Sequence, residues 1–274
     1  MAVLLRGLVY DKNPREEPPR MYHTTGFTTT EITELCALVA PHIPKRRRTT
    51  GRKPALSFFR SVAVTLTYLR RHHVQHELAE RFGTSQATIS RTITAFVPAL
   101  TVALTDWVPT VDDLDSNGQY IIDGSLLPCW SWRNRPDLYS GKHKRTGVTV
   151  QISCTLDGQL AWVSDPFPGS VHDTKALRES GFLDTTDNKP RHFGDRGYTG
   201  LNMITPHKKH ASRELADAEK QFNRQVNRIR YRVEQAIAHL KTWRILHTDY
   251  RRPYETFAET ITAIIGLKFY RKSF

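Results

Sequence analysis

The chain has 274 residues, and its 39% content of hydrophobic residues is sufficient for the buried core of one large domain or two smaller ones. A formal net charge of +13 indicates a polyanionic partner, most simply nucleic acid, and no run of residues approaches the roughly 20 apolar residues that a membrane span requires. The three cysteines are odd in number and lack a Cys-x-x-Cys spacing, which argues against a disulfide framework or a zinc knuckle and fits a reducing cytosol.

The first 30 residues show no clear periodicity, and the apolar start gives way to Asp11–Arg20 too early for a secretory signal. A short helix is predicted for Thr30–Val39, with Thr30 as its N-cap. The basic run Lys45–Pro54 follows it. This run is compatible with a solvated linker and also with a flexible arm that contacts DNA phosphates.

The next two segments predict helices, and the second has helix-turn-helix spacing. Apolar positions at helical intervals predict a helix over Leu56–His72. After it, Ala79 lets two helices approach, Gly83 takes the turn, and Ser85 caps a second helix whose Ile89 fills the core. The side chains that this second helix would expose to a major groove are Gln86, Ser90, Arg91 and Thr94. Ordinary helical hairpins share the spacing, but the positive charge of the chain favours DNA binding.

The polar stretch Pro109–Gly118 predicts a boundary between two domains. Residues 1–112 would form a helical region whose helix-turn-helix core spans about 56–100, and residues 113–274 an α/β domain. Strands are predicted at Gln119–Asp123, Gly147–Cys154, Gln159–Ser164 and Arg191–Asp195, and helices at Val171–Ser180, Ser212–Trp243 and Tyr254–Tyr270. The first three strands follow one another directly, which predicts an antiparallel meander.

The longest predicted helix, Ser212–Trp243, has three distinct faces. An apolar stripe that would dock the helix on a core consists of Val226, Ile229, Val233, Ile237 and Leu240. Beside it, within an arc of roughly 60°, lies a polar row of Asn227, Arg230, Glu234 and Lys241. The opposite face bears Arg224, Arg228 and Arg232. A glutamate beside a buried stripe is costly unless it is used, although an ion pair with Arg230 one turn away is the plainer explanation.

Two aspartates, Asp123 and Asp195, stand at the ends of predicted strands. If these strands are neighbours in a mixed sheet, both aspartates emerge at one end, and a helix packed on the sheet can bring Glu234 opposite them. Three converging carboxylates repel one another unless cations neutralise them, and Mg²⁺ or Mn²⁺ are suited to oxygen ligands. Two such ions roughly 3.5–4 Å apart can activate the attacking oxygen and stabilise the leaving oxygen of a phosphodiester.

Five motifs carry a resemblance to a known family. They are Ile122-Asp123-Gly-Ser, Tyr139–Lys144, Pro168–Asp173, Gly194–Tyr198 and Val233-Glu234-Gln with Lys241. In their order and content the chain resembles DDE-type transposases of the insertion sequence 5 group, which are related to the Harbinger elements and have a helix-turn-helix of their own.

The resemblance implies an α/β fold in which an all-α helix-turn-helix domain precedes an RNase H-like, mixed-sheet catalytic domain. It implies that Asp123, Asp195 and Glu234 are the catalytic residues and the ligands of two Mg²⁺ or Mn²⁺ ions. The helix motif of the family places Arg230 and Lys241 on the DNA end. Asn227 stands where that motif has a tyrosine, so no role of the tyrosine transfers to this chain.

Two further motifs have two interpretations each. Lys142, His143 and Lys144 lie in a predicted turn, which is either a solvated loop or a contact to DNA phosphates. His172 and Asp173 either support the metal ligands from behind or simply begin a helix.

The activity that the resemblance implies is transposition. The protein would bind the terminal inverted repeats of its element, hydrolyse the phosphodiester at the ends and transfer the freed 3′-hydroxyl to target DNA. Holding two ends together implies at least a homodimer on double-stranded DNA, and the expected location is the cytoplasm, at the nucleoid. Two other functions stay open: a DNA-binding regulator that no longer cleaves, and a nuclease without strand transfer.

Overall fold

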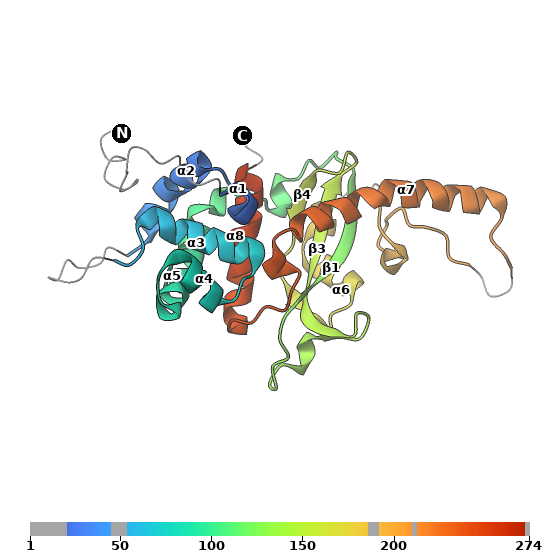
Figure 1. The fold of residues 1–274 in the computed structure, drawn as a ribbon. Helices are drawn as coiled ribbons and strands as arrows, with labels where there is room; N and C mark the ends of the chain where they lie inside the picture. The colour runs from blue at the N-terminus through green and yellow to red at the C-terminus, as the bar shows by residue number, and fades with distance from the viewer. Residues whose placement is uncertain (1–20, 45–53, 186–191, 210–212, 272–274) are drawn as a thin grey trace. The chain divides into compact units, whose positions relative to one another are not determined.

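The computed structural model describes residues 21–44, 54–185, 192–209 and 213–271 (Figure 1). By their internal packing these residues form two compact units. The first contains the described residues up to Val108, with Trp243–Ile245 and the residues from Glu255 onward. The second contains Pro109–Thr242 and Leu246–Tyr254. The basic run predicted at 45–54 lies almost entirely outside the described residues.

The first unit is built from helices. They are α1 (Tyr22–Thr25), α2 (Thr29–Val39), α3 (Phe58–Arg71), α4 (Gln75–Phe82), α5 (Gln86–Ala103) and α8 (Phe257–Tyr270). The prediction that Thr30 caps α2 is wrong. The helix begins one residue earlier, because the Thr28 hydroxyl accepts a hydrogen bond from the Glu31 N–H and the Glu31 carboxylate accepts one from the Thr28 N–H.

Helices α4 and α5 form the predicted helix-turn-helix. Gly83 ends α4 in the left-handed conformation with φ 60°, which glycine adopts at little cost. Ser85 caps α5, since its Oγ accepts from the Thr88 N–H at 3.3 Å. Ala79 and Ile89 are buried, as the spacing predicts. The predicted turn, cap and core positions of this motif are therefore confirmed.

The second unit has a five-stranded sheet organised around one long strand. The strands are β1 (Tyr120–Pro128), β2 (Tyr139–Ser140), β3 (Arg145–Thr155), β4 (Leu160–Val163) and β5 (Phe167–Pro168). Strand β1 pairs antiparallel with β3 along one edge, and β2, β5 and β4 pair antiparallel with successive parts of β3. The predicted antiparallel meander is confirmed. The prediction that a strand ends at Asp123 is wrong, because β1 continues through Asp123, opposite Ile152, as far as Pro128.

The strand predicted at Arg191–Asp195 is not formed within the described residues 192–195. A single parallel bridge joins Phe193 to Ile121 instead. Its two hydrogen bonds run from the Ile122 N–H to the Phe193 carbonyl at 2.8 Å and from the Phe193 N–H to the Tyr120 carbonyl at 2.9 Å. This bridge is enough to place the segment that ends in Asp195 directly beside β1. The expected mixed pairing is therefore present, but over one residue rather than along a full strand.

Two helices complete the second unit, α6 (Asp173–Glu179) and α7 (Asp217–Leu240). Helix α7 packs on β1 and β3 with its C-terminal half, and its N-terminal half extends away from the sheet (Figure 1). Val226, Val233 and Leu240 of the predicted apolar stripe are buried, while Ile229 and Ile237 are half-buried. The helix begins later than the predicted Ser212, at Asp217, and Ser212 itself lies outside the described residues. Among the helices that the structure describes, none combines the length and apolar character needed to cross a membrane.

The unit boundary after Val108 lies just before the polar stretch that predicts a domain boundary. Helix α8, predicted as Tyr254–Tyr270, packs in the first unit although it follows α7 in the chain. The division into two compact units does not show which residues bind DNA and which cut it. The assignment of residues 1–112 to DNA binding and 113–274 to catalysis therefore stays a prediction.

Candidate active site

Asp123 projects from the middle of β1, and its side chain is 19% exposed. Its Oδ2 lies 3.3 Å from Nη2 of Arg230 on α7, and its Oδ1 accepts a hydrogen bond from the Gly124 N–H at 2.9 Å. Burial raises the pKa of Asp123 to about 6, with Arg230 opposing the rise and the neighbouring Asp195 adding to it. The carboxyl group therefore needs positive charge beside it to stay ionised.

Asp195 is brought to Asp123 by the backbone rather than by a side-chain bond. The bridge at Phe193 fixes its segment beside β1. Asp195 then begins a single 3₁₀ turn, Arg196–Tyr198, and its Oδ1 accepts a hydrogen bond from the Gly197 N–H at 2.7 Å. The bridge pairs Phe193 with Ile121 in parallel, so Asp195, two residues after Phe193, comes beside Asp123, two residues after Ile121. The segments that bear the two aspartates therefore lie side by side, as the sequence predicts.

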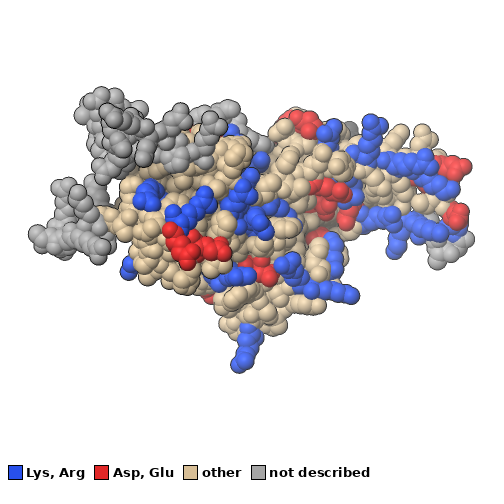
Figure 2. Space-filling model, viewed as in Figure 1, with Lys and Arg blue, Asp and Glu red and all other residues tan. Residues whose placement is uncertain are grey.

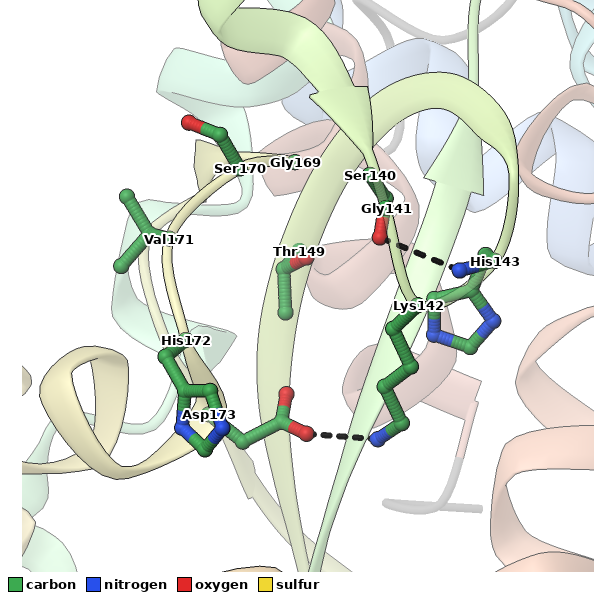
Figure 3. Close-up of a pocket in the computed structure, with 10 residues that line it drawn as sticks. All are labelled: Ser140, Gly141, Lys142, His143, Thr149, Gly169, Ser170, Val171, His172 and Asp173. Carbon is green, nitrogen blue, oxygen red and sulfur yellow. Dashed lines mark hydrogen bonds and ion pairs between the residues drawn. The ribbon is translucent and has the colours of Figure 1, made fainter.

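Asp173 is a third carboxylate near this part of β1. Lys142 Nζ lies 2.6 Å from its Oδ2, and the Asp173 side chain is only 12% exposed (Figure 3). On the other side it meets β1 at Gly124, where an added Cβ would lie 2.5 Å from Asp173 Oδ1. The helix-start interpretation is also right, because His172 caps α6 by accepting the Thr174 N–H on its Nδ1 at 3.4 Å. The turn that begins α6 therefore also places Asp173 among the acids.

Tyr198 and Gln151 form a buried polar pair behind the carboxylates. The Tyr198 hydroxyl donates to Gln151 Oε1 at 2.7 Å, and both side chains are fully buried. Burial raises the pKa of Tyr198, and Asp173, Asp123 and Asp195 raise it further. Sequence reasoning did not assign a role to either residue. The available signal was a glutamine inside the apolar strand β3, because a buried amide needs a partner.

Glu234 is exposed on α7, one turn beyond Arg230 on the same face. The ion pair between these two residues, which the sequence left open, is not formed, because Arg230 pairs with Asp123 instead. Lys241, at the end of the polar row, donates from Nζ to the Leu126 carbonyl of β1 at 3.1 Å. Burial lowers the pKa of Lys241, and Arg145 lowers it further. Arg230 and Lys241 of the polar row therefore contact β1, whereas Glu234 makes no hydrogen bond to Asp123 or Asp195.

The loop between β2 and β3 holds Lys142, His143 and Lys144, and all three are exposed. The His143 N–H contacts Ser140 Oγ at 3.4 Å (Figure 3). Lys144 adopts the left-handed conformation with φ 50°. Burial lowers the pKa of Lys142, but Asp173, Asp195 and Asp123 together raise it above its usual value. Lys142 is thus a counter-ion of the acid cluster, which consists of Asp123, Asp173 and Asp195, and Lys144 does not have that role.

The residues predicted to read DNA differ in how they are exposed. Arg91 and Thr94 are exposed on α5, whereas Gln86 and Ser90 are half-buried. Gln86 donates from Nε2 to Gln75 Oε1 at 2.7 Å, so its amide ties α5 to the start of α4. Arg91 and Thr94 are consequently the more accessible members of the set.

Comparison with known proteins identifies the family of the chain. Residues 122–268 match the family model of the DDE superfamily endonuclease, and this match covers Asp123, Asp173, Asp195 and Glu234. The chain belongs to the DDE superfamily endonucleases. Residues 54–106 match a second family, the helix-turn-helix of DDE superfamily endonuclease, which is the segment that holds α3 to α5.

Two curated proteins are similar to this DDE superfamily endonuclease. The "Putative transposase for insertion sequence element IS112" of Streptomyces albus G is 29% identical over 72% of this chain and 73% of its own length. The "Probable transposase for insertion sequence element IS702" of Microchaete diplosiphon is 25% identical over 81% of this chain and 84% of its own length. No solved structure matches the chain.

The DDE superfamily generally depends on divalent metal ions, and the residues of this site fit such ions in part. Asp123 and Asp195 offer the hard oxygen ligands that Mg²⁺ prefers, and positive charge already lies beside this site, with Arg230 paired to Asp123 and Lys142 paired to Asp173. In the part of the chain that the structure describes, no three His, Cys, Asp or Glu side chains are grouped to hold a metal ion. The structure therefore lacks a third metal ligand beside Asp123 and Asp195 among its described residues.

Proposed function

We propose that this DDE superfamily endonuclease is a transposase of the insertion sequence 5 group. It cuts phosphodiester bonds at the ends of its element and transfers the freed 3′-hydroxyl to target DNA. The observation that supports this most directly is the pair Asp123 and Asp195, held side by side by β1 and the Phe193 bridge. The family match and the printed names of both relatives agree with it.

In this proposal Asp123, Asp195 and Glu234 hold two Mg²⁺ or Mn²⁺ ions. Bound there, the ions would supply activation of the attacking oxygen and stabilisation of the leaving oxygen. Glu234 lies one turn, about 6 Å along the axis of α7, beyond the arginine that already contacts Asp123. We propose that Glu234 completes the site by changing its side-chain rotamer while Arg230 is displaced.

The chain's own cations have a second task in this proposal. Without DNA, Arg230 and Lys142 neutralise the carboxylates. When DNA binds, both cations turn to the phosphates of the bound strand. Asp173 is a positioning residue, because it holds Lys142 at the edge of the site and supports β1 at Gly124. His172 acts one step further back, as the cap that starts α6.

DNA binding is proposed for the helix-turn-helix and for the basic side chains around the site. The residues are Gln86, Ser90, Arg91, Lys142, Lys144, Arg230 and Lys241. A match to a helix-turn-helix family and the net charge of +13 support this. An RNase H-like arrangement of the sheet and a homodimer or larger oligomer on the two element ends belong to the same proposal.

Cleavage of supercoiled plasmid tests the proposal. The plasmid bears the DNA that flanks the gene, and it is incubated with Mg²⁺, Mn²⁺ or EDTA. We expect metal-dependent nicking at the element boundary by the intact protein, and only background nicking by Asp195→Asn. Asp165→Asn is the matched control, since Asp165 is an exposed aspartate outside the acid cluster.

Two results would contradict this proposal. Equal cutting by Asp195→Asn and the intact protein would remove the aspartates from the active site. Binding of the DNA by the intact protein without any cutting would favour a DNA-binding regulator instead.

A further inference from the structure

A cavity lies between α7 and the loop that follows Asp195. Its volume is about 520 Å³, and its lining includes Arg196, Met203, Pro206, His207, Lys208 and Phe222. This volume falls within the roughly 300–1,000 Å³ of small-molecule sites. The cavity therefore has room for one small planar group but not for a DNA duplex.

The walls of this cavity combine apolar surface with positive charge. Phe222 is 37% exposed, and its ring centroid lies 4.9 Å from that of His207 at an interplanar angle of 48°. Arg196 and Lys208 add two cations, and none of the described residues that line the cavity has a carboxylate. A ligand suited to such walls has a flat, apolar face and a negative charge beside it. A nucleobase with its flanking phosphate has both.

The cavity is held in shape before any ligand binds. Asn223, next to Phe222 on α7, accepts the His207 N–H on its Oδ1 at 2.7 Å and donates from Nδ2 to the His207 carbonyl at 3.1 Å. These two bonds tie the loop to the helix and keep the aromatic rings together. A preformed site of this kind loses little conformational entropy on binding.

The cavity also adjoins the segment that bears Asp195. Asp195 begins the 3₁₀ turn Arg196–Tyr198, so Arg196 in the cavity wall directly follows a proposed metal ligand. The extended half of α7 bears further Lys and Arg side chains along its length (Figure 2). A DNA strand that crosses Asp195 therefore meets basic surface on its way to Phe222.

We propose that this cavity holds one unpaired base of the DNA strand that passes the active site. The base stacks on Phe222 and His207, and its phosphates contact Arg196 and Lys208. Because a base inside a duplex cannot reach the cavity, the nucleotide leaves the stack or lies in a single-stranded tail. This inference rests on the proposed function, since it takes DNA as the substrate.

Binding to two DNA molecules tests the inference. One is a blunt duplex, and the other is the same duplex with a tail of unpaired thymidines, both in EDTA so that no cleavage occurs. Stacking of a base on an aromatic side chain changes affinity by about 5- to 150-fold when the side chain is removed. We expect the intact protein to prefer the tailed duplex by at least about fivefold, and Phe222→Ala to lose this preference.

Two variants control the experiment. Tyr231→Ala removes another exposed aromatic side chain from α7, one that does not line the cavity, and should keep the preference. Phe222→Trp should keep it as well, because tryptophan also stacks. As an independent readout, thymidines replaced by 5-iodouridine should cross-link to Phe222 or His207 on irradiation, with the attachment located by mass spectrometry.

Each outcome decides the matter. Equal binding of both duplexes by the intact protein, retention of the preference by Phe222→Ala, or cross-links only at other residues would overturn the inference. Cleavage of the plasmid would still stand in those cases, so the proposed function would survive. Failure of the intact protein to bind either duplex would overturn both.

Discussion

The helix-turn-helix and the acid cluster differ in how far apart in the chain their contacts are made. In α4 and α5, the caps at Gly83 and Ser85 bond to residues three or four positions away. In the acid cluster, Lys142 and Asp173 are 31 positions apart, and Arg230 and Asp123 are 107 apart. Sequence spacing alone determines the short-range contacts of the helix-turn-helix. The long-range contacts of the acid cluster depend on strand register and on how α7 packs.

Loss of the helix-turn-helix core should have the largest effect on stability. Ile89 is fully buried, and its replacement by alanine should lower the free energy of unfolding by about 2–5 kcal/mol. DNA affinity should fall together with stability, because α5 loses its packing against the core. Urea denaturation and gel shifts measure the two effects. The control is Ile89→Val, which should lower the free energy of unfolding by about 0.5–1.5 kcal/mol. An alanine variant as stable as the valine variant would contradict the prediction.

Removing the charge of Asp123 should change how stability depends on pH. Burial raises its pKa from 3.8 to about 6, so the folded protein binds this proton more tightly than the unfolded chain. The stabilising effect is complete below about pH 4 and is lost as the pH rises through 6. At pH 8 in EDTA, Asp123→Asn should therefore be more stable than the intact protein, by up to about 3 kcal/mol.

Thermal melts from pH 4 to pH 8 measure this difference. Asp165→Asn, at an exposed position, should follow the intact protein at every pH. If Asp123→Asn shows the same pH dependence as the intact protein, Asp123 is not held in the unfavourable surroundings described above.

Gly124 tests the close approach between β1 and Asp173. An alanine Cβ would lie 2.5 Å from Asp173 Oδ1 and 3.3 Å from the Tyr198 hydroxyl, so the acid must move. We expect Gly124→Ala to lower the free energy of unfolding by about 1–3 kcal/mol and to reduce cleavage while DNA binding in gel shifts persists. In the control, Gly141→Ala, the added Cβ meets no atom within 4 Å. Full cleavage by Gly124→Ala would show that the position of Asp173 is unimportant.

The same contrast explains what could be predicted from the sequence. The helices, the meander and the helix-turn-helix follow from apolar periodicity and turn residues, which act over short distances. Asp123 looked like the end of a strand because Gly124 and Ser125 interrupt the apolar pattern. In the structure β1 continues, and Asp123 and Gly124 are its two half-buried residues.

The side-chain partners at the site could not be predicted, because they join distant segments. Helical spacing puts Arg230 within reach of Glu234, yet the packing of α7 on β1 gives it Asp123 as a partner. The bond between Tyr198 and Gln151 likewise spans 47 positions and depends on where the segment after Phe193 lies beside β1. Sequence motifs predicted that Asp123 and Asp195 come together, whereas the cations that pair with the acids could be found only from the fold.

Removal of the N-cap of α5 should have the smallest effect on stability, and it tests a contact that depends on local geometry alone. Ser85 Oγ accepts the Thr88 N–H at 3.3 Å and also bonds to Thr88 Oγ1 at 3.0 Å, and because the Ser85 side chain is exposed, little besides these two contacts to Thr88 is lost on substitution. Ser85→Ala should lower the free energy of unfolding by about 1 kcal/mol, and Ser85→Asp, which can still accept the bond, should restore most of it. Because the cap acts only on the first turn of α5, cleavage at saturating protein should stay unchanged. A loss in Ser85→Asp as large as in Ser85→Ala, measured by urea denaturation, would mean that Ser85 acts through a contact other than the cap.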